Sequence, residues 1–180
     1  MDDQHEASLI AADFRAHFDQ YYLAVIPRLL NEDGLFLALL SMLTAVEALA
    51  GTYAPHLGTG ERFRAFVSAY FPSLYGPFVE SLWICRNKMV HSFNPGPFLL
   101  VCHQSRMHLV SASDVPMLNA EDFYADLIAA SRSYFRALYL DPDLQRKFAK
   151  RMTEGDGGRP YTSHIIESVE RRNTGIQSGR

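Results

Sequence analysis

Apolar residues recur along most of the chain at the three- and four-residue spacing of α-helices. This spacing predicts helices over about residues 7–30, 35–50, 61–70, 78–91, 120–139 and 142–152. Turn residues separate these segments, and Pro95 and Pro97 end the fourth one. The second segment is apolar nearly all round, which is typical of a helix in the middle of a bundle. We therefore expect a mainly α protein, built as a compact helical bundle.

The segment between the fourth and fifth helices has a different pattern. Residues 98–104 and 106–111 contain β-branched and aromatic residues, and apolar and polar positions roughly alternate along them. This pattern predicts a small inserted β-hairpin over about 98–111. Gly51 is expected just after the second helix, and Asn119 is expected to cap the fifth. From residue 153 onward the composition turns polar and rich in glycine. We expect a single domain over residues 1–152 and a flexible polar tail over 153–180.

Composition and charge narrow the possible functions. The chain has 180 residues and a net charge of −3, so no global field attracts nucleic acid and any polyanion site must be local. Cys85 and Cys102 form no CxxC pair, and no segment has the pattern of a signal peptide. The apolar stretch 35–49 is short for a bilayer and contains Glu47. We expect a reduced, cytoplasmic protein without a membrane segment.

The fourth predicted helix carries a charge in its apolar stripe. The stripe consists of Val79, Leu82, Trp83 and Val90. Arg86 falls at its centre, and a guanidinium cannot lose its charge, so it needs a partner, a ligand or a water-filled cleft. Glu47 is the only charged residue of the second helix and also needs a partner. A purely structural ion pair between Glu47 and Arg86 is one explanation of both residues.

Arg86 opens a segment that also contains Asn87 and, five positions on, His91. Asn87 and His91 are one helical turn apart, so the Asn87 amide can orient the imidazole. Arg86 lies about 140° from His91 around the helix, but its long side chain can still approach the imidazole. An arginine that stabilises charge on phosphate oxygens and a histidine that moves a proton are a pair that phosphoryl chemistry uses.

Arg-Asn-x-x-x-His at the end of a helix resembles the signature of HEPN domains. These are all-α bundles in which an earlier buried helix packs against the motif helix. Glu47 is similar to an acidic residue often found on that buried helix. The resemblance implies a metal-independent endoribonuclease without a cofactor, acting in a toxin–antitoxin or antiviral defence context. It also implies an RNA substrate, a homodimer and, for a toxin, a cognate antitoxin.

The resemblance assigns roles to individual residues. Arg86, Asn87 and His91 match the catalytic motif, and Glu47 and Lys88 are binding candidates. One His91 would remove the proton from a ribose 2′-OH, which attacks the adjacent phosphate. The His91 of a second copy would protonate the leaving 5′-oxygen, while Arg86 holds the phosphate.

Structural explanations stand beside these roles. His91 can satisfy free carbonyls at the helix end, and Lys88 points away from the stripe, as a solvated side chain does. His103 and His108 flank a predicted turn near Cys102, but their spacing matches no zinc pattern, so we expect solvent-facing strand residues. The rival function is a non-catalytic HEPN-like module that dimerises or binds a ligand. An open shared groove at Arg86 favours the enzyme, and a cleft filled by Glu47 and apolar side chains favours the module.

Overall fold

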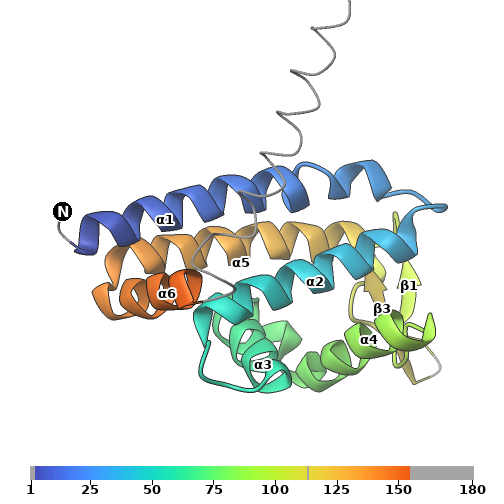
Figure 1. Ribbon diagram of the computed structural model, residues 1–180. Coiled ribbons are helices and arrows are strands. Elements are labelled where there is room, and N and C mark those ends of the chain that lie inside the picture. Colours follow the sequence, from blue (N-terminus) through green and yellow to red (C-terminus); the bar gives the residue numbers. More distant parts are fainter. Residues whose placement is uncertain (1–2, 113, 155–180) are drawn as a thin grey trace, which may run out of the picture.

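The computed structural model describes residues 3–112 and 114–154 and is mainly helical, as the periodicity predicted (Figure 1). Its α-helices are α1 (Asp3–Phe18), α2 (Leu35–Tyr53), α3 (Thr59–Tyr70), α4 (Val79–Ser92), α5 (Ala120–Leu140) and α6 (Pro142–Glu154). The helix predicted to end at 152 therefore reaches Glu154. The rest of the predicted tail, residues 155–180, lies outside the described residues.

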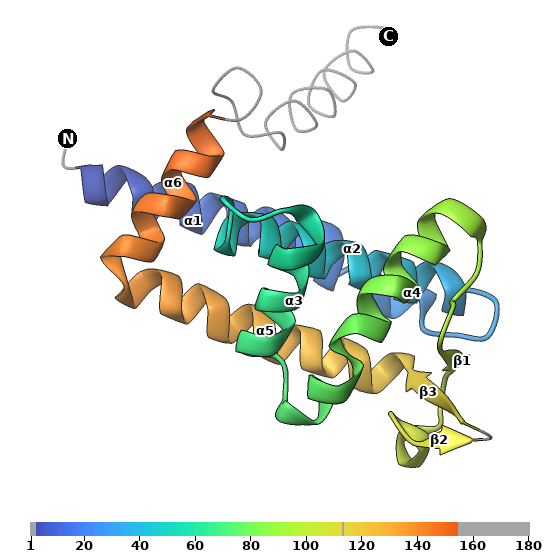
Figure 2. The same ribbon diagram turned by 90° about the horizontal axis from the view of Figure 1, so that it is seen from below.

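Helix α2 is the centre of the bundle. It contacts α3, α4, α5 and α6, and α3 and α4 cross beneath it (Figure 2). Its buried residues are Ala38, Leu39, Met42, Leu43, Ala45, Val46, Leu49, Ala50, Gly51 and Thr52. Most of these residues lie on one side of α2, whereas Leu40, Thr44 and Glu47 on the other side are half-buried, so the sequence is apolar over more of the helix than the bundle covers. Packing of the buried side against four other helices holds α2 in place.

The expectation that Gly51 follows the end of α2 is wrong, because the helix continues through Tyr53. Tertiary contacts hold this extra turn. The buried Tyr134 hydroxyl donates to Thr52 Oγ1 at 3.0 Å, and the Tyr53 ring packs edge-on against Phe66. A methyl group on Gly51 would meet only the flexible Arg62 side chain, at 3.8 Å. Gly51 is therefore an ordinary position within the helix, with room for a methyl group, and it does not mark the helix end.

The predicted helix over residues 7–30 is helical along most of its length but changes type twice. Helix α1 ends at Phe18 and is followed by a π-helical turn, η1 (Asp19–Leu23), and a 3₁₀ turn, η2 (Ile26–Leu29). The π turn is closed by the Ala24 N–H, which donates to the Asp19 carbonyl at 2.8 Å. Pro27 has no N–H to donate, which accounts for the short 3₁₀ turn.

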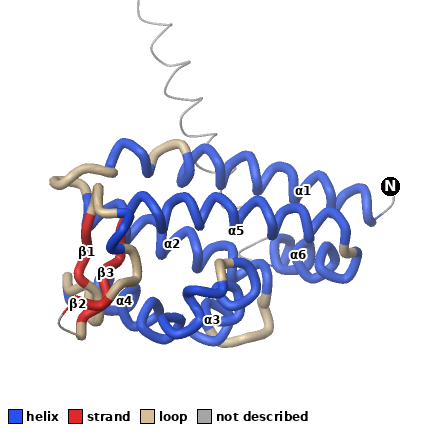
Figure 3. The backbone as a smooth tube through the Cα atoms, turned by 180° about the vertical axis from the view of Figure 1, so that it is seen from behind, coloured by secondary structure: helices blue, strands red, loops and turns tan. Residues whose placement is uncertain are grey.

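The predicted hairpin over residues 98–111 is wrong. The strands are β1 (Leu99–Val101), β2 (Ser111–Ala112) and β3 (Val115–Asn119), in the order β1-β3-β2. β1 pairs in parallel with β3, and β3 pairs antiparallel with β2. The expected first strand stops at Val101, two residues before the positive φ at His103. The expected second strand is broken by the 3₁₀ turn η4 (Ser105–Met107) and by the positive φ at Leu109. The sheet lies at one end of the bundle, where β3 leads directly into α5 (Figure 3).

Helix α2 is also longer than the apolar stretch judged too short for a bilayer. At 19 residues it is long and apolar enough to cross a membrane by length and composition alone. The core helix of a soluble protein passes the same test, and 56% of the most apolar part of α2 is buried inside the bundle. The contacts of α2 with four neighbouring helices match a core helix.

Candidate functional site

The motif helix α4 ends one residue after His91, as the sequence predicted. Its last residue is Ser92, and Phe93 then adopts a left-handed conformation with φ 49° and ψ 36°. The N–H groups of Phe93 and Asn94 both donate to the Lys88 carbonyl and close the helix. Pro95 and Pro97 prevent its continuation. His91 is therefore held in a helical last turn beside a sharp change of chain direction.

The residues of α4 that are buried are not all those of the predicted stripe. Leu82, Cys85 and Met89 are buried, whereas Val90 is exposed. The spacing of 82, 85 and 89 is one helical face, and Val90 lies about 100° away from Met89 on the helix. Arg86 therefore lies on the edge of the buried face rather than at its centre. Burial also raises the pKa of the Cys85 thiol to about 12, so this cysteine stays protonated.

Arg86 reaches Glu47 across the contact between α4 and α2. The Arg86 Nη2 and the Glu47 Oε2 form an ion pair, and each side chain is 17% exposed. Arg86 Nη1 donates to the Asn87 Oδ1 at 3.1 Å, and the guanidinium lies 5.8 Å from the centre of the Trp83 ring. The buried Arg86 Nε has no hydrogen-bond partner among the described residues. The predicted pairing of Glu47 with Arg86 is confirmed, and the Trp83 contact, which was not predicted, joins two residues three positions apart on one helix face.

The other motif residues do not all join this group. The Asn87 Oδ1 accepts from Arg86, and the expected hydrogen bond from Asn87 to His91 is absent among the described residues. His91 is exposed, and no described ion pair or hydrogen bond links it to Arg86. Lys88 is exposed and its aliphatic stem packs over Gly96, which matches a solvated position. The structure therefore joins Glu47, Arg86 and Asn87 directly and leaves His91 on the adjoining surface.

Phe93 is an exposed and strained aromatic residue two positions after His91. The residue is 85% exposed, and its left-handed conformation is one that glycine or asparagine usually adopts at a helix end. Its ring stacks on Phe36, with centroids 6.3 Å apart. The exposure of the apolar ring and the strain of the backbone both raise the free energy of a single, isolated copy of the protein. This conformation was not predicted, although Phe93 directly follows the helix whose end the prolines indicated.

A second polar group lies between η3 (Ser73–Phe78), the β1–β2 connection and α5. The Asn119 N–H donates to the His108 Nδ1 at 3.2 Å, so a neutral His108 carries its hydrogen on Nε2. That Nε2 lies 2.8 Å from the Tyr75 hydroxyl, which donates to the Asp126 Oδ2 at 2.8 Å. We call these residues the Tyr75–His108 network. The expectation that His108 faces solvent on a strand is wrong, because it is half-buried in a loop.

Electrostatics in this network follow from burial. Burial lowers the pKa of His108, although the nearby Asp122 and Asp126 carboxylates act in the opposite direction. Burial and the hydrogen bond to Asp126 raise the pKa of Tyr75, so its hydroxyl keeps its proton. His103, by contrast, is exposed in a left-handed loop position and pairs with Glu121. Within residues 3–112 and 114–154, no group of three His, Cys, Asp or Glu side chains is placed to hold a metal ion.

Comparison with known proteins adds no relative. No family model matches the chain, and no curated protein or solved structure matches it. The resemblance to HEPN domains therefore rests on the motif residues, their place at the end of α4 and the position of Glu47 on the buried helix α2.

The Glu47–Arg86 pair is expected to be energetically coupled. Arg86→Leu should leave Glu47 without its cation and destabilise the fold by about 2–3 kcal/mol, just below the range for fully buried pairs because both side chains keep some water contact. Glu47→Leu should cost a similar amount. The double variant should be no less stable than either single variant, measured by urea unfolding. Additive losses would show that the two charges do not depend on each other.

Stability should depend on pH through His108. Its folded pKa is below the ordinary value of about 6.5, so the unfolded chain takes up the proton first as the pH falls. The contribution of neutral His108 is therefore complete above about pH 6.5 and is lost as the pH drops toward the folded pKa. His108→Gln should flatten the fall in unfolding free energy between about pH 7 and 5, measured by urea unfolding at each pH. The exposed loop variant His56→Gln is the control, and equal slopes in both variants would exclude His108 as the source.

Proposed function

We propose that the protein is a metal-independent endoribonuclease of HEPN type, acting as a cytoplasmic homodimer in a toxin–antitoxin or defence context. The observation that carries the proposal is the way Arg86 is held. Glu47 and Asn87 fix its guanidinium at the edge of the core, within the same two turns of α4 that present His91 to solvent. The combination of a fixed cation and an accessible imidazole at one helix end suits RNA cleavage through the 2′-OH.

In this proposal Glu47 is a positioning residue rather than a catalytic one. A buried arginine without a carboxylate would be costly to keep near the core, and its rotamer would not be fixed. With Glu47 bound to Nη2 and Asn87 to Nη1, the guanidinium plane has a defined orientation. His91 would take the proton from the 2′-OH, and Lys88, exposed on the same helix, would contact the RNA backbone.

One copy supplies one His91, whereas the reaction needs a base and an acid. A two-fold dimer would bring a second His91 to the same phosphate. Phe93 supports a contact between two copies at this end of α4, because burial of its exposed ring would offset the strain of its backbone. The stack on Phe36 joins the start of α2 to the same surface.

A non-catalytic dimerisation or ligand-binding module is the second candidate, and the surroundings of Arg86 favour it, because Glu47 and the Trp83 ring occupy the space beside the guanidinium. The charge of Arg86 is already balanced by Glu47, and the described contacts of Arg86 do not include His91. An arginine used only to join α2 and α4 would show the same contacts. The two candidates differ in what the loss of His91 does, since an exposed histidine without a catalytic role can be removed without effect.

The purified protein is expected to cut RNA in the presence of EDTA and to leave 2′,3′-cyclic phosphate ends. His91→Ala should abolish cutting while the circular dichroism spectrum stays unchanged, because His91 is exposed and supports no core contact. His56→Ala, an exposed histidine in the α2–α3 loop, should cut like the wild type. Cutting that requires magnesium or survives His91→Ala would exclude this mechanism. A wild-type protein that dimerises but cuts no RNA would favour the module.

The proposed dimer should depend on Phe93. Phe93→Gly removes the exposed ring and suits the left-handed backbone, so monomer stability should change by no more than about 1 kcal/mol, while sedimentation velocity should show loss of the dimer. Leu140→Ser removes another exposed apolar side chain, at the end of α5 beside α6, and should leave the dimer intact. A Phe93→Gly protein that sediments as a dimer would place the contact elsewhere.

A further inference from the structure

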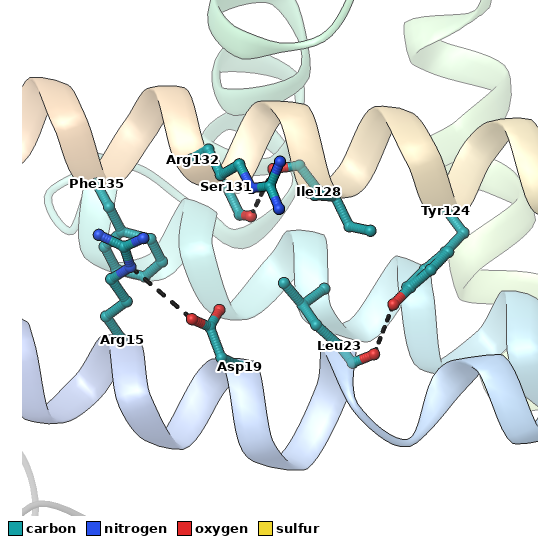
Figure 4. A pocket seen from close by; sticks show the side chains of 8 residues that line it. All are labelled: Arg15, Asp19, Leu23, Tyr124, Ile128, Ser131, Arg132 and Phe135. Carbon is teal, nitrogen blue, oxygen red and sulfur yellow. Dashed lines mark hydrogen bonds and ion pairs between the residues drawn. The ribbon is translucent and has the colours of Figure 1, made fainter.

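A pocket of about 270 Å³ lies between the first helical segment and α5, separate from the Arg86 region. Arg15 of α1 and Asp19 and Leu23 of η1 form one wall, and residues of α5 form the other (Figure 4). In Figure 1, α1 and α4 lie on opposite sides of α2 and α5. The pocket is therefore not an extension of the proposed ribonuclease site.

The π turn η1 shapes this pocket. A π turn carries one more residue than an α turn, and such turns occur frequently at functional sites. Here it places Asp19 and Leu23 on the wall of the pocket. The Leu23 carbonyl accepts a hydrogen bond from the Tyr124 hydroxyl, which ties the turn to α5. Burial raises the pKa of Tyr124, so this tie persists at neutral pH.

Two arginines enter the pocket from opposite walls. Arg15 lies 3.8 Å from the Asp19 carboxylate, with both side chains half exposed, and over the Phe135 ring at 5.6 Å. Arg132 on α5 forms no ion pair or hydrogen bond with the described residues. Two guanidiniums and one carboxylate leave the pocket with one uncompensated positive charge. The fork of donors on Arg132 suits a planar carboxylate.

The rest of the lining is partly apolar. Leu23, Ile128 and Phe135 contribute hydrocarbon surface, and the Ser131 hydroxyl is directed to the Ile128 carbonyl at 2.9 Å rather than to a ligand. A volume of about 270 Å³ is below the usual range for drug-sized ligands, so the occupant must be small. One unbalanced charge matches a monoanion, and Asp19 opposes a dianion such as a phosphate monoester.

We propose that this pocket binds a small carboxylic acid with an apolar body, held by Arg132 and Arg15. The carboxylate pairs with the Arg132 guanidinium, and the hydrocarbon part lies against Leu23, Ile128 and Phe135. Arg15, kept in place by Asp19 and the Phe135 ring, completes the positive side of the pocket. The site is independent of RNA cleavage and remains in a protein that lacks this activity.

Benzoate is the probe for this site, and calorimetric titration of the full chain is the measurement. Benzoate should bind, whereas benzamide, which has the same shape without the charge, and acetate, which lacks the apolar body, should bind at least about tenfold more weakly. Arg132→Gln should weaken benzoate binding by about tenfold or more. Arg136→Gln removes an exposed arginine one turn along α5 that does not line the pocket, and it should bind benzoate like the wild type.

A second test removes the negative charge of Asp19. Asp19→Asn should raise the affinity for phenyl phosphate relative to that for benzoate, because the carboxylate that repels the second charge of the phosphate is removed, whereas any loss of order at Arg15 affects both probes. Circular dichroism of each variant establishes that the fold is kept. Equal affinity in Arg132→Gln and Arg136→Gln, or equal binding of benzoate and benzamide, would overturn the proposal. Stronger binding of phenyl phosphate than of benzoate to the wild type would also overturn it.

Discussion

The burial of α2 is the constraint on which the rest of the structure depends. A helix that is apolar on nearly every side is stable in water only when other elements cover it, and α3, α4, α5 and α6 do so. Glu47 is the exception, because it places the single charge of α2 at the contact with α4. The helix that covers this position must bring a cation, and α4 brings Arg86. The ion pair therefore ties the rotation of α4 to the core, since a turn by one residue would carry Arg86 about 100° away from Glu47.

This dependence explains why part of the site could be predicted from the sequence. The helices follow from apolar spacing, which is a local property, and the pairing of Glu47 with Arg86 follows from two charges that each need a partner beside the core. Both predictions are confirmed. The position of His91 in the last turn of α4 also followed locally, from the prolines behind it. The separation of His91 from Arg86 and Asn87 among the described residues could not be predicted, because it depends on Asn87 accepting a hydrogen bond from Arg86 rather than contacting His91.

Three differences from the predictions share a physical origin in contacts between distant parts of the chain. β1 pairs with β3, which lies further along the chain, and the register that places Leu100 opposite Leu118 cannot be read from either segment alone. The capping position of Asn119 was predicted correctly, yet its side chain accepts from the Gln104 N–H instead of capping α5. Tyr75, His108 and Asp126 come together from three separate segments. In each case a tertiary hydrogen bond outweighs the local preference.

The balance of charge at Arg86 makes the proposed chemistry depend on dimerisation. Within one copy Glu47 cancels Arg86, so Lys88 supplies the remaining fixed positive charge of the motif segment. A single site would therefore attract a phosphate weakly, and the chain as a whole carries a net charge of −3. Two motif segments facing each other would double the local positive charge and supply both the acid and the base. The dimer proposed from Phe93 would thus create the electrostatic field that one copy lacks, as well as the second His91. A protein built in this way would be inactive as a monomer for two separate reasons, and the concentration of the protein itself would then control its activity.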